Sequence, residues 1–149
     1  MSEAATTRRI EGGCHCGNIR YTFFWPGGET IPVRACGCSF CLKHGGVYTS
    51  HPQGRIEVRI ADPAAVAHYA FGTKTADFHI CRTCGVFPLV TCDLEGTRYA
   101  VVNVNTFEGV DPAQLVRSSA DFEGESVGDR LARRRRNWIP DVRIDEAGS

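Results

Sequence analysis

Short stretches in which apolar and polar residues alternate run through much of the chain. The clearest are residues 19–23 (IRYTF) and 56–60 (IEVRI), and residues 78–80 (FHI) show the same pattern. Alternation at every second position is typical of a strand with one buried face. Residues 86–90 form another apolar segment, and residues 99–105 (YAVVNVN), which are rich in β-branched side chains, give the strongest strand prediction. The chain is therefore expected to be mainly β.

Signals for helices are few and local. Asp111 and Pro112 precede residues 113–116 as an N-cap followed by proline, which predicts one or two helical turns. Residues 129–136 are a second candidate for a short helix, and residues 62–66 for a single turn. The 16 glycines and 7 prolines provide turns between the strands. These patterns predict short antiparallel strands with one or two short helices.

Length and composition indicate one domain and no membrane segment. A chain of 149 residues can bury a core of its own, so we expect a single domain over residues 1–149. No apolar stretch approaches the roughly 20 residues that span a bilayer, and residues 1–10 lack the apolar segment of a secretory signal. Because free thiols persist in a reducing compartment, a cytoplasmic location is expected.

The 17 basic and 17 acidic residues balance. No overall charge therefore draws the protein to nucleic acid or to an anionic membrane. The exception is local, because Arg133 to Arg136 are four consecutive arginines. The alternative interpretations are a solvated basic face and a site for an acidic ligand or a phosphate. Nothing in the sequence orients these side chains, so the solvated face is the expectation.

Seven of the eight cysteines fall into three tight clusters. The clusters are Cys14-His15-Cys16, Cys36-Gly37-Cys38-Ser39-Phe40-Cys41 and Cys81-Arg82-Thr83-Cys84. A disulfide between cysteines one residue apart would close a strained ring, whereas thiolates at these spacings can share a metal ion. The first and last clusters together supply four sulfurs, which predicts one structural zinc ion bound by Cys14, Cys16, Cys81 and Cys84. Buried cysteines without a metal are the alternative.

The middle cluster predicts a different kind of site. Zinc held by Cys36, Cys38 and Cys41 would keep a fourth position for water or a ligand, as catalytic zinc sites do. His44 follows closely and is the candidate for a fourth ligand or a proton donor, and a second structural zinc remains the alternative. Zinc with three thiolates has a formal charge of −1, which favours binding a thiol over activating water. Cys92 is expected to be a buried side chain, or else a thiol near this site.

The three clusters, in this order, resemble those of the glutathione-dependent formaldehyde-activating enzyme family, also called the centromere protein V-like family. The matching stretches are residues 13–21 (GCHCGNIRY), 35–41 (ACGCSFC) and 78–85 (FHICRTCG), with weaker similarity at 102–110 and 138–139. The resemblance extends from about residue 9 to residue 139 and implies a single zinc-binding domain with its core there.

The resemblance implies a β-rich fold of the β-tent kind with two zinc ions. Its structural ligands would be Cys14, Cys16, Cys81 and Cys84, and its catalytic ligands Cys36, Cys38 and Cys41. The founding activity of the family joins glutathione and formaldehyde into S-hydroxymethylglutathione, a carbon–sulfur lyase reaction run in reverse. The implied partner is therefore a small thiol, glutathione, and the proton for the product would come from water or His44.

A non-catalytic function is the alternative. The same cysteines could stabilise a binding module for a protein or nucleic-acid partner that contacts Arg133 to Arg136. A metal saturated by His44 and salt-sensitive binding of polynucleotides would favour this alternative. Because the charge is balanced, nucleic acid is not the expected partner, and neither is a membrane. A monomer or a homodimer is expected.

Overall fold

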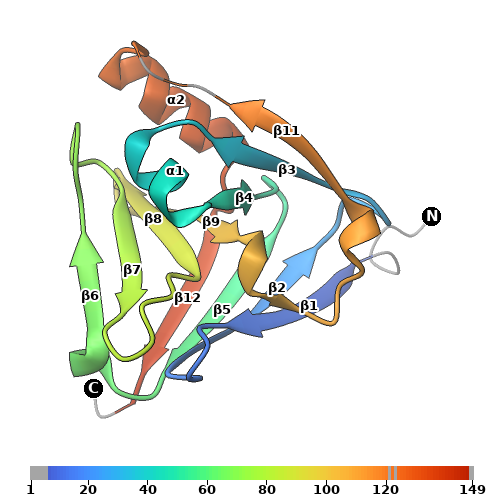
Figure 1. Ribbon diagram of the computed structural model, residues 1–149. Helices are drawn as coiled ribbons and strands as arrows, with labels where there is room; N and C mark the ends of the chain where they lie inside the picture. Colours follow the sequence, from blue (N-terminus) through green and yellow to red (C-terminus); the bar gives the residue numbers. More distant parts are fainter. Residues whose placement is uncertain (1–6, 121, 123, 148–149) are drawn as a thin grey trace.

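Two β-sheets enclose the core of the protein. The computed structural model describes residues 7–120, 122 and 124–147, and Figure 1 shows the strands along three sides of a roughly triangular outline. In sheet order, the five-stranded sheet consists of β10 (Phe107–Glu108), β1 (Arg8–Gly13), β2 (Ile19–Trp25), β5 (Arg55–Ile60) and β12 (Asp141–Glu146). The seven-stranded sheet consists of β11 (Leu115–Ala120), β3 (Ile31–Cys36), β4 (Val47–Thr49), β9 (Thr97–Asn103), β8 (Leu89–Leu94), β7 (Asp77–Cys81) and β6 (Val66–Tyr69). The prediction of a mainly β fold is confirmed.

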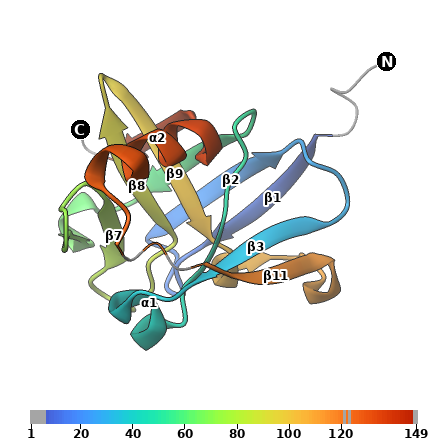
Figure 2. The same cartoon turned by 90° about the horizontal axis from the view of Figure 1, so that it is seen from above.

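The α-helices of the described residues are short. Helix α1 (Ser39–His44) connects β3 to β4, and α2 (Val127–Asn137) lies between β11 and β12 in the chain. Figure 2 shows α2 lying across β8 and β9. The predicted helix at residues 129–136 is therefore confirmed and is slightly longer than expected. No helix in the described part of the chain is long and apolar enough to cross a membrane.

Single turns of 3-10 helix occur at η2 (Pro63–Ala65), η3 (Val104–Thr106) and η4 (Pro112–Gln114). In η2 and η4 the aspartate before the proline accepts a hydrogen bond from a backbone N–H, which confirms the N-cap predicted at Asp111 and the single turn predicted at residues 62–66. The predicted helix at residues 113–116 is wrong beyond Gln114. Leu115 and Val116 begin β11, because pairing with β3 satisfies their backbone groups in the sheet.

The alternating sequences form central strands, as predicted. Ile19, Tyr21 and Phe23 of β2 and Ile56 and Val58 of β5 are all fully buried between the sheets. Each such side chain contributes about 1.5–3 kcal/mol to folding when it is removed from water. The apolar segment 86–90 becomes a strand only from Leu89 onward.

The sheets are not purely antiparallel. Among the described residues, β11 pairs with β3 and β12 pairs with β5 in parallel, whereas the other pairs are antiparallel. The strands β11 and β12 come from the last third of the chain, and each pairs in parallel with a strand from its first half. The fold therefore depends on contacts between segments that are distant in the sequence.

Candidate metal centres and the adjoining pocket

The first and last cysteine clusters meet where the two sheets come together. Cys14 and Cys16 lie in the turn between β1 and β2, Cys81 is the last residue of β7, and Cys84 lies in the turn that follows. Their four sulfurs lie within 4.8 Å of one another, with 3.8 Å between Cys14 Sγ and Cys16 Sγ and 3.4 Å between Cys16 Sγ and Cys81 Sγ. A tetrahedron of sulfurs about 2.3 Å from zinc has edges of about 3.8 Å. This donor set therefore fits a zinc ion.

Local backbone geometry supports this four-cysteine group. The glycines that follow the two pairs have positive φ, 90° at Gly17 and 82° at Gly85, and the backbone N–H of Ile19 donates to Cys14 Sγ at 3.3 Å. Burial raises the pKa of the Cys84 thiol. Hydrogen bonds from backbone N–H groups, of which that of Val86 has the largest effect, outweigh burial and lower this pKa to about 6. At Cys84 the thiolate, which is the form that binds metal, is therefore favoured. All eight cysteines are free, so none of them forms a disulfide.

The middle cluster forms a second group around the start of α1. Cys36 ends β3, Cys38 is the N-cap of α1 and accepts a hydrogen bond from the backbone N–H of Cys41 at 3.4 Å, and Cys41 lies within the helix. The three sulfurs lie within 4.8 Å of one another, and no other Cys, His, Asp or Glu of the described residues belongs to the group. Three thiolates with a place for a fourth ligand also fit zinc.

Hydrogen bonds within this three-cysteine group shift the pKa values of its thiols in different directions. The hydrogen bond from Cys41 lowers the pKa of Cys36 to about 5, whereas the same contact together with burial raises the pKa of Cys41. The hydroxyl of Tyr48, on β4, lies 3.0 Å from Cys41 Sγ. Burial raises the pKa of Tyr48, so its hydroxyl keeps its proton and can donate it to the sulfur in a hydrogen bond.

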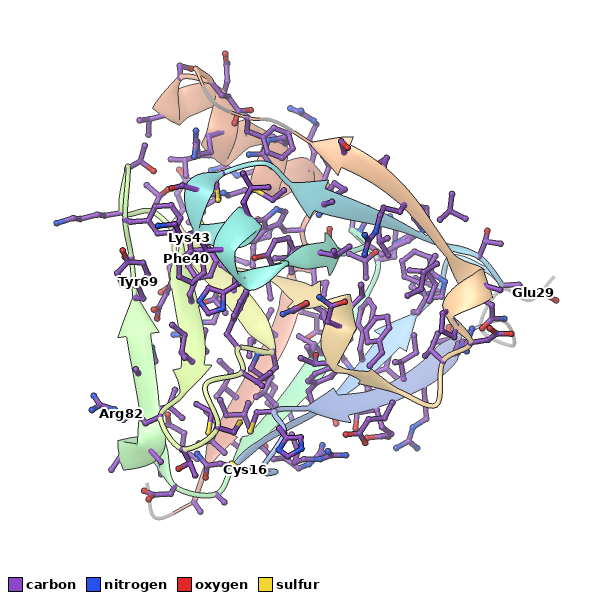
Figure 3. The ribbon with its side chains drawn as sticks, viewed as in Figure 1. Cys16, Glu29, Phe40, Lys43, Tyr69 and Arg82 are labelled. Carbon is purple, nitrogen blue, oxygen red and sulfur yellow. The ribbon has the colours of Figure 1, made fainter. Side chains whose placement is uncertain are left out.

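His44 lies at the end of α1, outside the three-cysteine group. Its ring is 4.5 Å from the ring of Phe40 and 5.1 Å from that of Phe87, as measured between centroids. Figure 3 shows Phe40 and Tyr69 far from Cys16, so the aromatic cluster beside α1 is well separated from the four-cysteine group. The structure brings together all seven predicted cysteine ligands in two groups but places His44 in neither. Cys92 is buried on β8, as expected.

A pocket of about 350 Å³ opens beside the three-cysteine group. Its walls include Phe71, Phe78 and Trp138, and its charged lining consists of Arg34, Arg130, Arg133 and Arg134. Cys36, Cys38 and Cys41 all contribute to its surface. The pocket therefore combines a potential metal centre with apolar walls and several guanidinium groups.

Comparison with known proteins is consistent with this arrangement of cysteines. The sequence model of the glutathione-dependent formaldehyde-activating enzyme family matches residues 9–122. The chain belongs to this family. It also resembles a solved crystal structure, that of a Rhodobacter sphaeroides protein determined as a structural genomics target, with 28% sequence identity and a TM-score of 0.53. That comparison covers 72% of this chain and 99% of the other.

Helix α2 lies beyond the part of the chain that matches the formaldehyde-activating family. Its arginines correct the expectation of a uniformly solvated basic face. Arg135 and Arg136 are exposed, but Arg134 is only 6% exposed, donates to Thr75 Oγ1 at 2.8 Å and lies against the ring of Trp138. Packing of α2 on β8 turns one side of the helix toward the pocket, which the sequence alone could not indicate.

Arg133 and Arg34 line the same pocket but differ in their partners. Arg133 donates two hydrogen bonds of 3.0 Å to Glu125 and lies over the ring of Phe122. Arg34 donates to Ser50 Oγ at 3.2 Å, and no carboxylate of the described residues pairs with it. Sequence analysis missed Arg34, although residues two apart on a strand share a face and Cys36 follows it by two.

Proposed function

We propose that this member of the formaldehyde-activating family is a zinc-dependent enzyme that forms and breaks a carbon–sulfur bond between glutathione and formaldehyde, formally a carbon–sulfur lyase. One observation carries the proposal: the three-cysteine group opens into a pocket lined by arginines. A group without a fourth protein donor suits a metal that binds substrate, and guanidinium groups suit a thiol that carries carboxylates. The four-cysteine group would bind a second, structural zinc.

The three-cysteine group supplies the reacting sulfur with a place to bind. Zinc bound by Cys36, Cys38 and Cys41 would hold the sulfur of an incoming thiol as its thiolate. Tyr48 would keep Cys41 oriented through the hydrogen bond to its sulfur, because ligands held by an outer partner stay fixed. The walls formed by Phe78 and Trp138 would limit the water around the reacting groups.

Arginine side chains would bind the rest of the substrate. Burial and the nearby charge of Arg133 lower the pKa of Arg34, so an anion beside it would offset an unfavourable environment. Glutathione carries two carboxylates, and an arginine can bind a carboxylate through two parallel hydrogen bonds. Positioning the thiol in this way would contribute to the rate mainly through proximity to the aldehyde.

The reaction is balanced without any oxidant or reductant. The thiolate sulfur adds to the formaldehyde carbon, the electron pair of the C=O bond moves to oxygen, and that oxygen takes one proton. Water that enters the open pocket can supply the proton. His44 stays a candidate for this role, although its ring packs on Phe40 and Phe87 at the edge of α1.

Magnetisation-exchange NMR tests the proposed activity directly. The rate of exchange between free formaldehyde and S-hydroxymethylglutathione is measured with and without the zinc-loaded protein. We expect acceleration by the wild-type protein and none by the folded Cys38→Ser variant. An exchange rate equal to the uncatalysed rate with the fully loaded wild-type protein would contradict the proposed reaction.

A further inference from the structure

Two histidines and an aspartate meet on the edge of the seven-stranded sheet. None of them belongs to either cysteine group, although His79 precedes Cys81 by two residues on β7. His68 lies on the edge strand β6, directly opposite His79 on β7. Asp77 precedes His79 by two residues on the same strand, so both side chains lie on one face. The ladder of hydrogen bonds between β6 and β7 therefore fixes the relative positions of all three.

The donor atoms of these residues converge on a small volume. Asp77 Oδ2 lies 2.9 Å from His68 Nδ1 and 3.7 Å from His79 Nε2, and one ligand atom from each residue lies within 4.8 Å of the other two. Nitrogen and oxygen ligands at about 2.1 Å from one metal ion are about 3.4 Å apart in a tetrahedral arrangement. The observed distances lie on either side of this value, so small side-chain shifts would suffice to bind an ion.

His79 is an unusual residue for a structural position. Its side chain is 6% exposed, and its Nε2 is 2.8 Å from Thr91 Oγ1, whereas its Nδ1 is buried without a hydrogen-bond partner among the described residues. The nitrogen near Asp77 is Nε2, so a metal ion bound there would take the place of its contact with Thr91.

The surroundings leave room for an ion and its water ligands. A pocket of about 640 Å³ is lined by His68, Asp77 and His79, and also by Thr91 and Asp93. His68 and Asp77 are half exposed, so an ion can reach the cluster from solvent. Two imidazoles and one carboxylate with open positions are a ligand set that proteins use for zinc and other divalent transition metals.

We propose that His68, Asp77 and His79 form a third metal site, which binds a divalent transition-metal ion of the Zn²⁺ type through two imidazoles and one carboxylate. The site is chemically distinct from the two thiolate groups. Because it lacks sulfur, it accepts harder divalent ions than they do. The remaining coordination positions are filled by water from the pocket.

Counting bound zinc tests this site. Wild-type protein, His68→Ala and Asp77→Asn are dialysed to equilibrium against Zn²⁺ under reducing conditions, and zinc per chain is measured by mass spectrometry. His51→Ala, which changes a histidine outside every candidate group, is the matched control. We expect one zinc fewer in the two cluster variants than in wild type and no change in the control. Equal zinc content in all four proteins would overturn the proposal.

Histidine ring nitrogens provide a readout that does not depend on the cysteines. ¹⁵N-labelled protein is titrated with Zn²⁺ beyond the amount that saturates the thiolates, and the ring-nitrogen shifts are followed. His68 and His79 should shift together, whereas His51 should not. If neither ring responds, or only His68 does, the cluster is a hydrogen-bonded pair of His68 and Asp77 and not a metal site.

Discussion

Arg34 is the residue on which the selectivity of the proposed pocket depends most. It lines the pocket two residues before Cys36, and no carboxylate in the described part of the chain neutralises it. Among the other pocket arginines, Glu125 already pairs with Arg133 and lies 3.6 Å from Arg130. Arg134 is only 6% exposed and donates to Thr75 Oγ1. A substrate carboxylate would therefore gain most from Arg34.

Replacement of Arg34 by methionine should weaken binding of glutathione specifically. A hydrogen bond to a charged group contributes about 1.5–3 kcal/mol, so we expect KM for glutathione to rise roughly tenfold to a hundredfold. A small thiol without carboxylates, such as 2-mercaptoethanol, should show a much smaller change. Steady-state kinetics with both thiols measures the difference.

Arg136→Met is the matched control for this variant. Arg136 is exposed on α2 and does not line the pocket, so its loss should change neither KM. Equal losses for glutathione and for the uncharged thiol in Arg34→Met would mean that Arg34 supports the fold of the pocket and does not recognise charge.

At the scale of elements, the position of α2 depends on an ion pair at its start. Glu125, just before the N-cap Ser126, accepts hydrogen bonds from Arg133 on the next turns of the helix. The hydrogen bond from Arg133 holds the pKa of Glu125 below its ordinary value of 4.5. A carboxyl with a lowered folded-state pKa stabilises the fold above its ordinary pKa, and this stabilisation is lost as pH falls through the lowered value.

Glu125→Gln should therefore lower the melting temperature at pH 7 and have progressively less effect as the pH falls below the ordinary pKa of 4.5 and through the lowered one, because wild-type Glu125 then also becomes protonated. Thermal unfolding followed by circular dichroism at several pH values measures this. Glu95→Gln is the control, since Glu95 pairs with Arg135 on the exposed surface, where an ion pair contributes little. A difference that persists unchanged at pH 3 would contradict the assigned role.

Elements with local signals were predictable from the sequence, and elements defined by distant contacts were not. The turns η2 and η4 follow from Asp-Pro pairs, and β2 and β5 follow from their alternation. The parallel pairing of β12 with β5 joins residues more than eighty positions apart, and no local pattern specifies such a partner. The cysteine groups were predictable because metal-binding spacing is itself local within each cluster. Tyr48 and the buried side of α2 were missed because only packing brings them to the pocket.

At the scale of the whole molecule, the four-cysteine group joins the two sheets. Cys14 and Cys16 belong to the turn between β1 and β2 of the five-stranded sheet, whereas Cys81 ends β7 of the seven-stranded sheet. A metal ion there would link segments that are 65 residues apart, as the contact between Cys16 and Cys81 shows. The three-cysteine group instead lies within one short segment, from the end of β3 to α1.

This difference predicts that two single substitutions of cysteine by serine have different effects on the melting temperature. Cys81→Ser removes a ligand of the ion that would join the sheets, so the melting temperature should fall by roughly 10 °C or more. Cys38→Ser should leave it nearly unchanged, because serine is a good N-cap and can still accept the hydrogen bond from Cys41 that starts α1. Calorimetry of both variants measures this, and a strong chelator should bring the wild-type protein down to the melting temperature of Cys81→Ser. If the two variants melted at the same temperature, the division into one metal that supports the fold and one that serves the pocket would be wrong.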